Sequence, residues 1–148
     1  MKILGVDPGR EGGVALVGPE NYEALPLRYE GDRVCMNTLA ALVSEWQPDQ
    51  VWIEVPQSRP SGSEGNGRSS GLSYGLMLGY FWARGIPVHE VHPQRWKRTM
   101  GVTAEKTTSI AEAARRFPNV ALVLPRRRRA HDGMAEALLI AAYGRGQS

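Results

Sequence analysis

Lys2-Ile3-Leu4-Gly5-Val6-Asp7-Pro8-Gly9 is an apolar run that leads directly into an aspartate and a Pro-Gly turn. A second apolar run, Val14-Ala15-Leu16-Val17, follows within a few residues, so the pattern predicts a β-hairpin. Asp7 then stands at the end of the first strand, where rigid backbone holds its carboxylate at the edge of the sheet. Any site built on Asp7 therefore needs partners from other strand ends or from helices.

The composition predicts one globular domain that spans residues 1–148. With 148 residues, 42% of them hydrophobic, the chain is large enough to bury a core. Its apolar runs are shorter than a membrane span, and the N-terminus lacks the pattern of a signal peptide. A single cysteine excludes an internal disulfide and a cysteine-based zinc site. We therefore expect a soluble, cytoplasmic protein without a membrane partner.

The positive charge of the chain is concentrated in one segment. Residues 92–129 contain ten Arg or Lys and two acids, a net charge of +8, which leaves −5 for the rest of a chain whose total is +3. Four of these arginines, Arg126 to Arg129, are consecutive. A basic segment on a mildly acidic body indicates a polyanionic partner, most often nucleic acid, although a solvated basic face is the ordinary alternative.

Periodicity and turn residues predict the remaining elements. Further strands are expected at residues 22–27, 50–55 and 86–91, and helices at 36–46, 72–83, 93–100, 104–116 and 132–143, with Thr103 as a cap and Gly144 as a stop. The glycine- and serine-rich residues 57–71 predict a mobile loop. Short turns between early strands favour antiparallel pairing, and helices between later strands favour parallel addition. The expected fold class is α/β, a mixed five-stranded sheet with helices on both faces.

Two further groups of acids are placed to meet Asp7. Glu54 ends the strand at 50–55, and parallel neighbouring strands bring their carboxyl ends to the same edge of a sheet. Asp132 and Glu136 are four residues apart, so they share one face of a helix that is otherwise almost entirely apolar and therefore buried. A second acid inside a buried helix needs a partner, because an unpaired buried charge is costly.

A divalent cation would provide that partner. Carboxylates are preferred ligands of Mg²⁺ and Mn²⁺, and three or four of them suffice for two ions. One ion would activate an attacking water, and the other would stabilise the leaving 3′-oxygen of a phosphodiester. Each acid alone has an ordinary explanation as a turn, strand-end or capping residue. Their combined positions favour a metal-dependent nuclease.

Three motifs resemble those of the RuvC family of Holliday junction resolvases, within the ribonuclease H-like superfamily. They are Gly5-Val6-Asp7-Pro8-Gly9, Ile53-Glu54 and His131-Asp132-Gly133-Met134-Ala135-Glu136-Ala137-Leu138-Leu139-Ile140-Ala141. The likeness covers the whole chain in order and is greatest to bacteriophage members. It implies a ribonuclease H-like fold and a homodimeric, Mg²⁺- or Mn²⁺-dependent crossover junction endodeoxyribonuclease. Such an enzyme makes paired symmetric nicks in four-way DNA junctions during recombination and repair, in a bacterial or phage-infected cell.

The resemblance also implies roles for individual residues. Asp7, Glu54 and Asp132 would be metal ligands, with Glu136 as the fourth acid. Family members commonly space their last two ligands three residues apart, whereas Asp132 and Glu136 are four apart. We therefore rank Asp132 first, Glu136 second and His131 third as the principal ligand of the last helix. Lys106 matches a family lysine near the scissile phosphate, where it would stabilise transition-state charge.

The remaining expectations concern surfaces. Residues 57–71 resemble the junction-facing loop of the family, and the helix at 72–83 is the expected dimer surface, through Leu72, Met77, Tyr80 and Phe81. The residues expected to bind DNA are Arg68, Arg95, Lys97, Arg98, Arg126, Arg127, Arg128 and Arg129.

The sequence is also compatible with three other functions. Another ribonuclease H-like nuclease, acting on RNA/DNA hybrids or on branched or flap DNA, would use the same acids. A sugar-kinase or actin-type ATPase also ends its first strand in an aspartate and a glycine-rich turn, but it needs two related domains. A non-catalytic DNA-binding module on a decayed nuclease fold is disfavoured by the presence of all three acidic sites.

Overall fold

The computed structural model describes the backbone of residues 1–57 and 64–148 and the side chains of residues 1–57 and 68–148. The order of its helices and strands is largely the one that the sequence predicts. They are β1 (Ile3–Asp7), β2 (Gly13–Val17), β3 (Tyr22–Pro26), β4 (Tyr29–Glu30), β5 (Arg33–Val34), α1 (Met36–Trp46), β6 (Gln50–Glu54), α2 (Glu64–Ala83), β7 (Val88–Val91), α3 (Pro93–Met100), α4 (Lys106–Arg116) and α5 (Asp132–Gln147).

The main sheet has five strands in the order β3-β2-β1-β6-β7, so the predicted mixed sheet is confirmed. β1, β2 and β3 pair antiparallel, whereas β6 runs parallel to β1 and β7 runs parallel to β6. Val6 lies opposite Ile53 in the parallel pair. The next residue of each strand is an acid, Asp7 in β1 and Glu54 in β6, so both carboxylates reach the same edge of the sheet.

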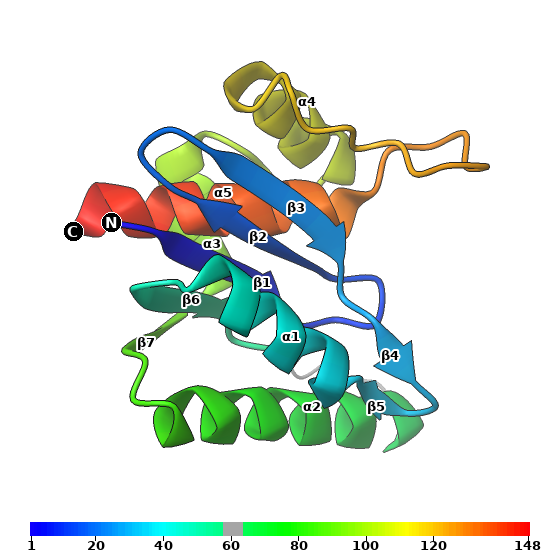
Figure 1. Ribbon diagram of the computed structural model, residues 1–148. Coiled ribbons are helices and arrows are strands. Elements are labelled where there is room, and N and C mark those ends of the chain that lie inside the picture. The colour runs from blue at the N-terminus through cyan, green and yellow to red at the C-terminus, as the bar shows by residue number, and fades with distance from the viewer. Residues whose placement is uncertain (58–63) are drawn as a thin grey trace.

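Helices cover both faces of this sheet, with α3, α4 and α5 on one side and α1 and α2 on the other (Figure 1). The central strand shows why. Ile3 belongs to the core under α5, and its neighbour Leu4 belongs to the core under α1 and α2. Because successive side chains of a strand point to opposite faces, a strand covered on both sides reads as a continuous apolar run.

Glycines allow α5 to lie unusually close to β1 and to the turn after it. A Cβ added to Gly5 would lie 2.1 Å from the carbonyl oxygen of Ala137, and one added to Gly133 would lie 2.2 Å from that of Glu11. Gly12 and Gly133 also form an isolated parallel bridge. The first turn of α5 therefore rests on the β1–β2 turn, and this contact brings the acids of α5 to the end of β1.

Replacing Gly133 with alanine should destabilise the protein by about 1–3 kcal/mol, because the added methyl group overlaps the backbone of Glu11 and neither backbone can yield freely. The free energy of unfolding from urea titrations measures this effect. Gly146→Ala is the matched control in the same helix, since a Cβ there has no neighbour within 4 Å. Because Gly146 lies at the end of α5, this substitution should change the free energy of unfolding by less than about 0.5 kcal/mol. Equal effects of the two substitutions would contradict the close-contact explanation.

The structure corrects the predicted start of α2. This helix begins at Glu64 instead of Leu72, so the predicted loop is wrong for residues 64–71, while residues 58–63 lie outside the described part. Contacts with the β4–β5 hairpin, which sequence periodicity missed, support the early turns of the helix. The Ser69 hydroxyl donates a hydrogen bond to the backbone carbonyl of Asp32, and further along the helix the buried Ser73 hydroxyl accepts one from the backbone N–H of Val34 at 2.9 Å. Such tertiary contacts outweigh the low helix propensity of glycine.

Two predicted helix boundaries are also wrong. α5 continues through Gly144 to Gln147, and a Cβ at Gly144 would lie 2.3 Å from the indole ring of Trp52, so this glycine permits packing instead of ending the helix. α4 begins at Lys106 without a side-chain cap, because Thr103 lies too early and accepts a hydrogen bond from the backbone N–H of Glu105. Among the helices that the structure describes, none is long and apolar enough to cross a membrane.

Candidate metal centre

Three carboxylates converge at the carboxyl ends of β1 and β6. Asp7, Glu54 and Glu136 each offer an oxygen, and these three oxygens lie within 4.8 Å of one another. The first two come from neighbouring strand ends, and Glu136 comes from the second turn of α5, which lies across β1. Glu136 is only 8% exposed, whereas Asp7 and Glu54 are partly buried. An all-carboxylate donor set of this size fits a hard divalent cation.

The electrostatics of the cluster also favour a cation. Burial, followed by the nearby charges of Glu54 and Glu136, raises the pKa of Asp7 from 3.8 to about 8, against the opposing hydrogen bond from the backbone N–H of Gly9. Burial also raises the pKa of Glu54, with Glu136 adding to the shift and a hydrogen bond from Trp96 opposing it. Burial is the larger cause of both pKa shifts and mutual repulsion adds to it, so a bound cation would favour the charged carboxylates.

Two lysines approach the acids of α5. The Lys97 ammonium lies 2.9 Å from Oε1 of Glu136, and the Lys106 ammonium lies 2.9 Å from Oδ2 of Asp132. The hydrogen bond to Asp132 raises the pKa of Lys106, although desolvation opposes this. Lys106 is largely exposed at the rim, whereas Lys97 is mostly buried. Lys97 was expected on the DNA-binding surface, but the structure turns its ammonium toward the acids.

The structure distinguishes the three candidate ligands of α5. Asp132 lies outside the 4.8 Å group and pairs with Lys106, although it is close enough to raise the pKa of Asp7. His131 is the N-cap of the helix, and its Nδ1 accepts a hydrogen bond from the backbone N–H of Met134 at 3.1 Å. Glu136 is therefore the α5 residue whose carboxylate joins those of Asp7 and Glu54, and the ranking of the three residues as metal ligands stays a prediction.

Sequence reasoning missed two residues that contact the cluster. The indole Nε1 of Trp96 donates to Oε2 of Glu54 at 2.6 Å, and the buried hydroxyl of Ser109 donates to Oε1 of Glu136 at 3.3 Å. A signal for Trp96 was present, because Pro93, Trp96 and Met100 form the buried stripe of α3 at helical spacing. Nothing in the local sequence distinguishes Ser109 from other small residues of α4.

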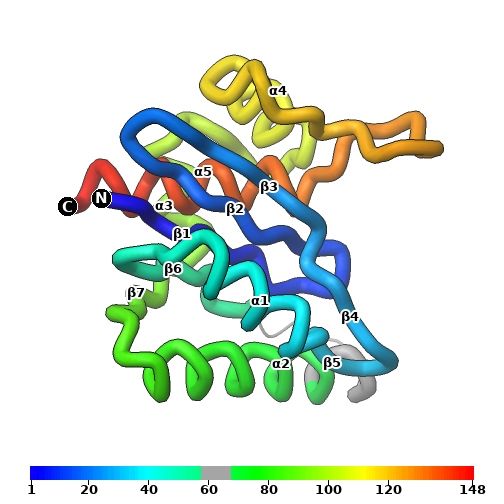
Figure 2. The backbone as a smooth tube through the Cα atoms, viewed as in Figure 1, coloured from blue at the N-terminus to red at the C-terminus, as the bar shows by residue number. Residues whose placement is uncertain are grey.

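The four consecutive arginines lie on a hairpin that leads into α5. Val123 and Ala130 form an antiparallel bridge, and the tip between them includes Arg126, which has a positive φ of 64°. This hairpin projects from the body beside the start of α5 (Figures 1 and 2). All four arginines are exposed, and none forms an ion pair with another residue of the described ranges. Arg95 and Arg98 of α3 and Arg68 of α2 are also exposed, outside the acidic cluster.

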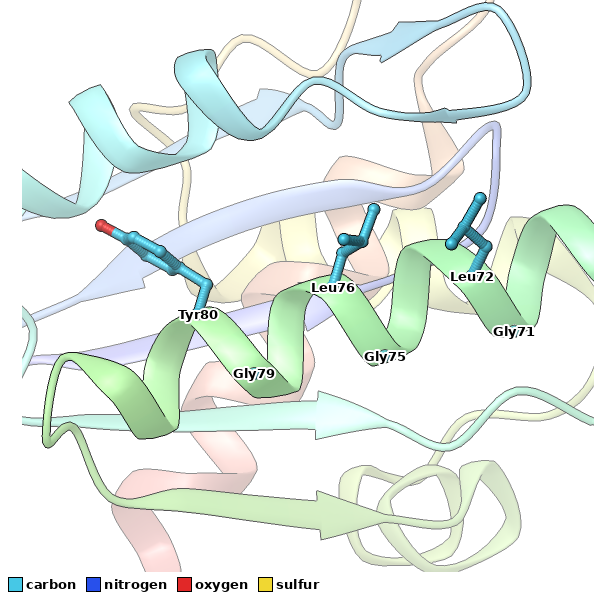
Figure 3. Close-up of a pocket in the computed structure, with 6 residues that line it drawn as sticks. All are labelled: Gly71, Leu72, Gly75, Leu76, Gly79 and Tyr80. Atoms are coloured by element: carbon cyan, nitrogen blue, oxygen red, sulfur yellow. The ribbon is translucent and has the colours of Figure 1, made fainter.

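The outer face of α2 carries an open apolar hollow of about 520 Å³. Gly71, Gly75 and Gly79 line it together with Leu72, Leu76 and Tyr80, whose side chains extend from the same side of the helix (Figure 3). Of the four residues expected at a dimer surface, Leu72 and Tyr80 lie here. Met77 and Phe81 are fully buried in the core beneath α2 instead, so they are not surface residues.

Comparisons with known proteins identify the fold. No family model matches the chain, and no curated protein matches it in sequence. Solved structures do match. The Thermus thermophilus RuvC complex with a Holliday junction substrate has a TM-score of 0.65 at 17% identity, covering 100% of this chain and 97% of that chain. A second Thermus thermophilus RuvC structure has a TM-score of 0.63 at 20% identity, covering 99% and 96%.

A third neighbour comes from a eukaryote. The yeast mitochondrial Holliday junction resolvase Ydc2 has a TM-score of 0.61 at 12% identity, covering 95% of this chain and 76% of that chain. None of these three proteins comes from a bacteriophage, so the expected likeness to phage members stays a prediction. The sheet order, the helices on both faces and these likenesses together show that the chain has the ribonuclease H-like α/β fold.

Proposed function

We propose that this chain is a metal-dependent endonuclease that resolves four-way DNA junctions by paired symmetric nicks. The observation that carries the proposal is the convergence of Asp7, Glu54 and Glu136 at one edge of the sheet. Its fold neighbours support the choice of substrate, since the described relatives are Holliday junction resolvases and one of them holds such a junction. The rim of the site and the adjacent arginine hairpin also suit a polyanionic substrate.

Asp7, Glu54 and Glu136 would hold a Mg²⁺ or Mn²⁺ ion, and Asp132 would contribute to a second. Such ions, when bound, lower the pKa of a coordinated water and offset the charge that develops on a phosphodiester. Asp7 suits a position shared by both ions because the charges of Glu54, Glu136 and Asp132 all act on its carboxylate. Lys106 is exposed beside Asp132, so its ammonium can contact the phosphate at the rim and stabilise transition-state charge there.

The exposed arginines would position the DNA. Arg126 to Arg129 precede Asp132 by only a few residues. A DNA backbone whose phosphates bind the hairpin would therefore pass close to the acidic cluster. Arg95, Arg98 and Arg68 would add further phosphate contacts from α3 and α2. The sequence predicted that Lys97 binds DNA. We assign it a different role, because its ion pair with Glu136 makes it a counter-charge inside the cluster. Contacts of this kind give affinity and register without reading base sequence.

Paired nicks in two strands require two active sites, and each copy of this chain carries one acidic cluster among its described residues. A two-fold homodimer would supply the second site. The outer face of α2 is our proposed interface, because its three glycines leave an open hollow beside Leu72, Leu76 and Tyr80. Small residues along one helix face allow a second helix to approach closely.

Gly75→Glu should therefore convert the dimer into a folded monomer. The substitution places a charge at the centre of the hollow, while the space around the Cβ position leaves the isolated fold undisturbed. Sedimentation velocity measures the mass, and circular dichroism checks the fold. Leu25→Glu introduces the same charge at an exposed position of the edge strand β3, so it is the control and should stay dimeric. A variant at Gly75 that remains dimeric would place the interface elsewhere.

The function is tested by a cleavage assay on a panel of substrates, with the Asp7→Asn variant as the negative control. The panel contains a four-way junction, a flap, an RNA/DNA hybrid and a linear duplex, each with and without Mg²⁺ or Mn²⁺. We expect metal-dependent nicks at symmetric positions in two opposed junction strands, mapped on all four strands. Cleavage of hybrids or flaps without junction cleavage would overturn the proposal in favour of another ribonuclease H-like nuclease.

A further inference from the structure

Two consecutive residues of α3 contact two different acids of the cluster. The indole N–H of Trp96 donates to Glu54, and the ammonium of Lys97 pairs with Glu136. The same ammonium lies 5.2 Å from the centroid of the Trp96 ring. A single turn of α3 therefore connects the acid of β6 with the acid of α5.

The packing of Trp96 makes its hydrogen bond directional. The side chain is fully buried in the core formed with Val91, Met100 and α5, and this packing restricts the orientation of the ring. An indole N–H can only donate a hydrogen bond. The Nε1 of Trp96 lies 2.6 Å from Oε2 of Glu54, so this hydrogen bond occupies that oxygen. The Glu54 carboxylate has no other hydrogen bond within the part of the chain that the structure describes, so its second oxygen, Oε1, is free to bind a cation.

We propose that Trp96 is a positioning residue, whose indole N–H fixes one oxygen of Glu54 and thereby presents the other to a divalent cation shared with Asp7 and Glu136. This inference rests on the proposed metal-dependent function and deepens it. Residues that orient a metal ligand in this way determine affinity through geometry, because an unrestrained carboxylate loses rotational freedom when the ion binds. Burial of the indole provides that restraint before any ion arrives.

The sharpest test removes only the N–H. Incorporating 3-benzothienylalanine at position 96 replaces the indole nitrogen with sulfur and keeps the ring size, so the core stays filled. We expect the Mn²⁺ affinity of the DNA-free protein, measured by electron paramagnetic resonance, to fall about 10- to 100-fold. Thermal unfolding without metal should change little. Unchanged Mn²⁺ affinity in this variant would overturn the proposal.

Indole resonances give a second readout that a purely structural role would not move. The chain has four tryptophans, so each indole N–H gives one assignable ¹H–¹⁵N signal. Mg²⁺ should shift the Trp96 signal and leave that of Trp82, which is 61% exposed on α2, unchanged. Glu54→Gln should also displace the Trp96 signal in the absence of metal. A Trp96 signal that is insensitive to both changes contradicts the proposal.

A conventional pair of variants complements the isostere. Trp96→Phe should weaken Mn²⁺ binding, whereas Trp82→Phe, the same change at an exposed position, should not. Mn²⁺ binding and junction cleavage by the wild type distinguish a failure of this inference from a failure of the proposed function. If the wild type binds Mn²⁺ and cuts junctions while the isostere binds Mn²⁺ equally well, only the role of Trp96 is wrong. A wild type that binds no Mn²⁺ overturns both.

Discussion

Asp7→Asn should lower the rate of junction cleavage at least about 10³-fold while junction binding and folding are retained. The substitution removes one carboxylate charge from the cluster but almost no volume. Cleavage is measured under single-turnover conditions with saturating Mg²⁺, and binding is measured in Ca²⁺ or without metal. Asp32→Asn makes the same chemical change at an exposed carboxylate that pairs with Arg33, and it should cleave normally.

Asp7→Asn should also change how the free energy of unfolding depends on pH. The pKa of Asp7 is about 8 in the folded protein and 3.8 ordinarily, so the folded state binds the proton more tightly than the unfolded state. The free energy of unfolding of the metal-free wild type therefore contains a component that is present below about pH 4 and is lost as the pH rises to about 8. Asparagine does not titrate, so Asp7→Asn should become more stable relative to the wild type across this range.

Mg²⁺ provides the complementary measurement. At pH 8 it should raise the melting temperature of the wild type by neutralising the cluster, and it should raise that of Asp7→Asn much less. Thermal unfolding at several pH values, with and without Mg²⁺, tests both parts. Loss of junction binding together with cleavage would mean that Asp7 is a structural residue, and full cleavage by Asp7→Asn would exclude it from the site.

Replacing Arg126 to Arg129 together with alanine should produce the second large effect, on binding. We expect junction affinity near 0.1 M salt to fall about 10- to 100-fold, because the positive charges that displace counterions from the phosphates are lost. The slope of log K against log salt should become shallower by up to about 4, one for each phosphate contact removed. Fluorescence anisotropy over a salt series measures both quantities, and cleavage of pre-bound junction should be affected less.

Two other arginines of the basic segment provide a control for the loss of positive charge outside the hairpin. Arg115 and Arg116 lie at the end of α4 away from Lys106, and both pair with Glu112. Replacing them with alanine lowers the net charge without touching the hairpin, so the salt slope should stay near that of the wild type. A slope unchanged in the four-arginine variant, or reduced equally in the control, would show that the hairpin does not contact DNA.

Much of the fold could be predicted because its signals are local. The apolar run ending in Asp7, the strand ending in Glu54 and the apolar helix carrying Asp132 and Glu136 all lie where periodicity and turn residues placed them. The mixed sheet follows from the lengths of the connections between strands. Boundaries were less accurate where distant contacts decide them, as in the early turns of α2, where Ser69 binds Asp32, and at Gly144, which packs on Trp52.

The sequence by itself therefore determined the class of sheet, the three acidic positions and the basic segment, since each depends on neighbouring residues or on helical spacing. Only the tertiary structure decided that Glu136 joins Asp7 and Glu54 while Asp132 pairs with Lys106, and that Lys97 and Trp96 turn inward to the acids. The physical reason is that α5 packs closely against the β1–β2 turn, where Gly133 contacts Gly12. That contact sets the rotation of the helix relative to β1, and no local pattern encodes it.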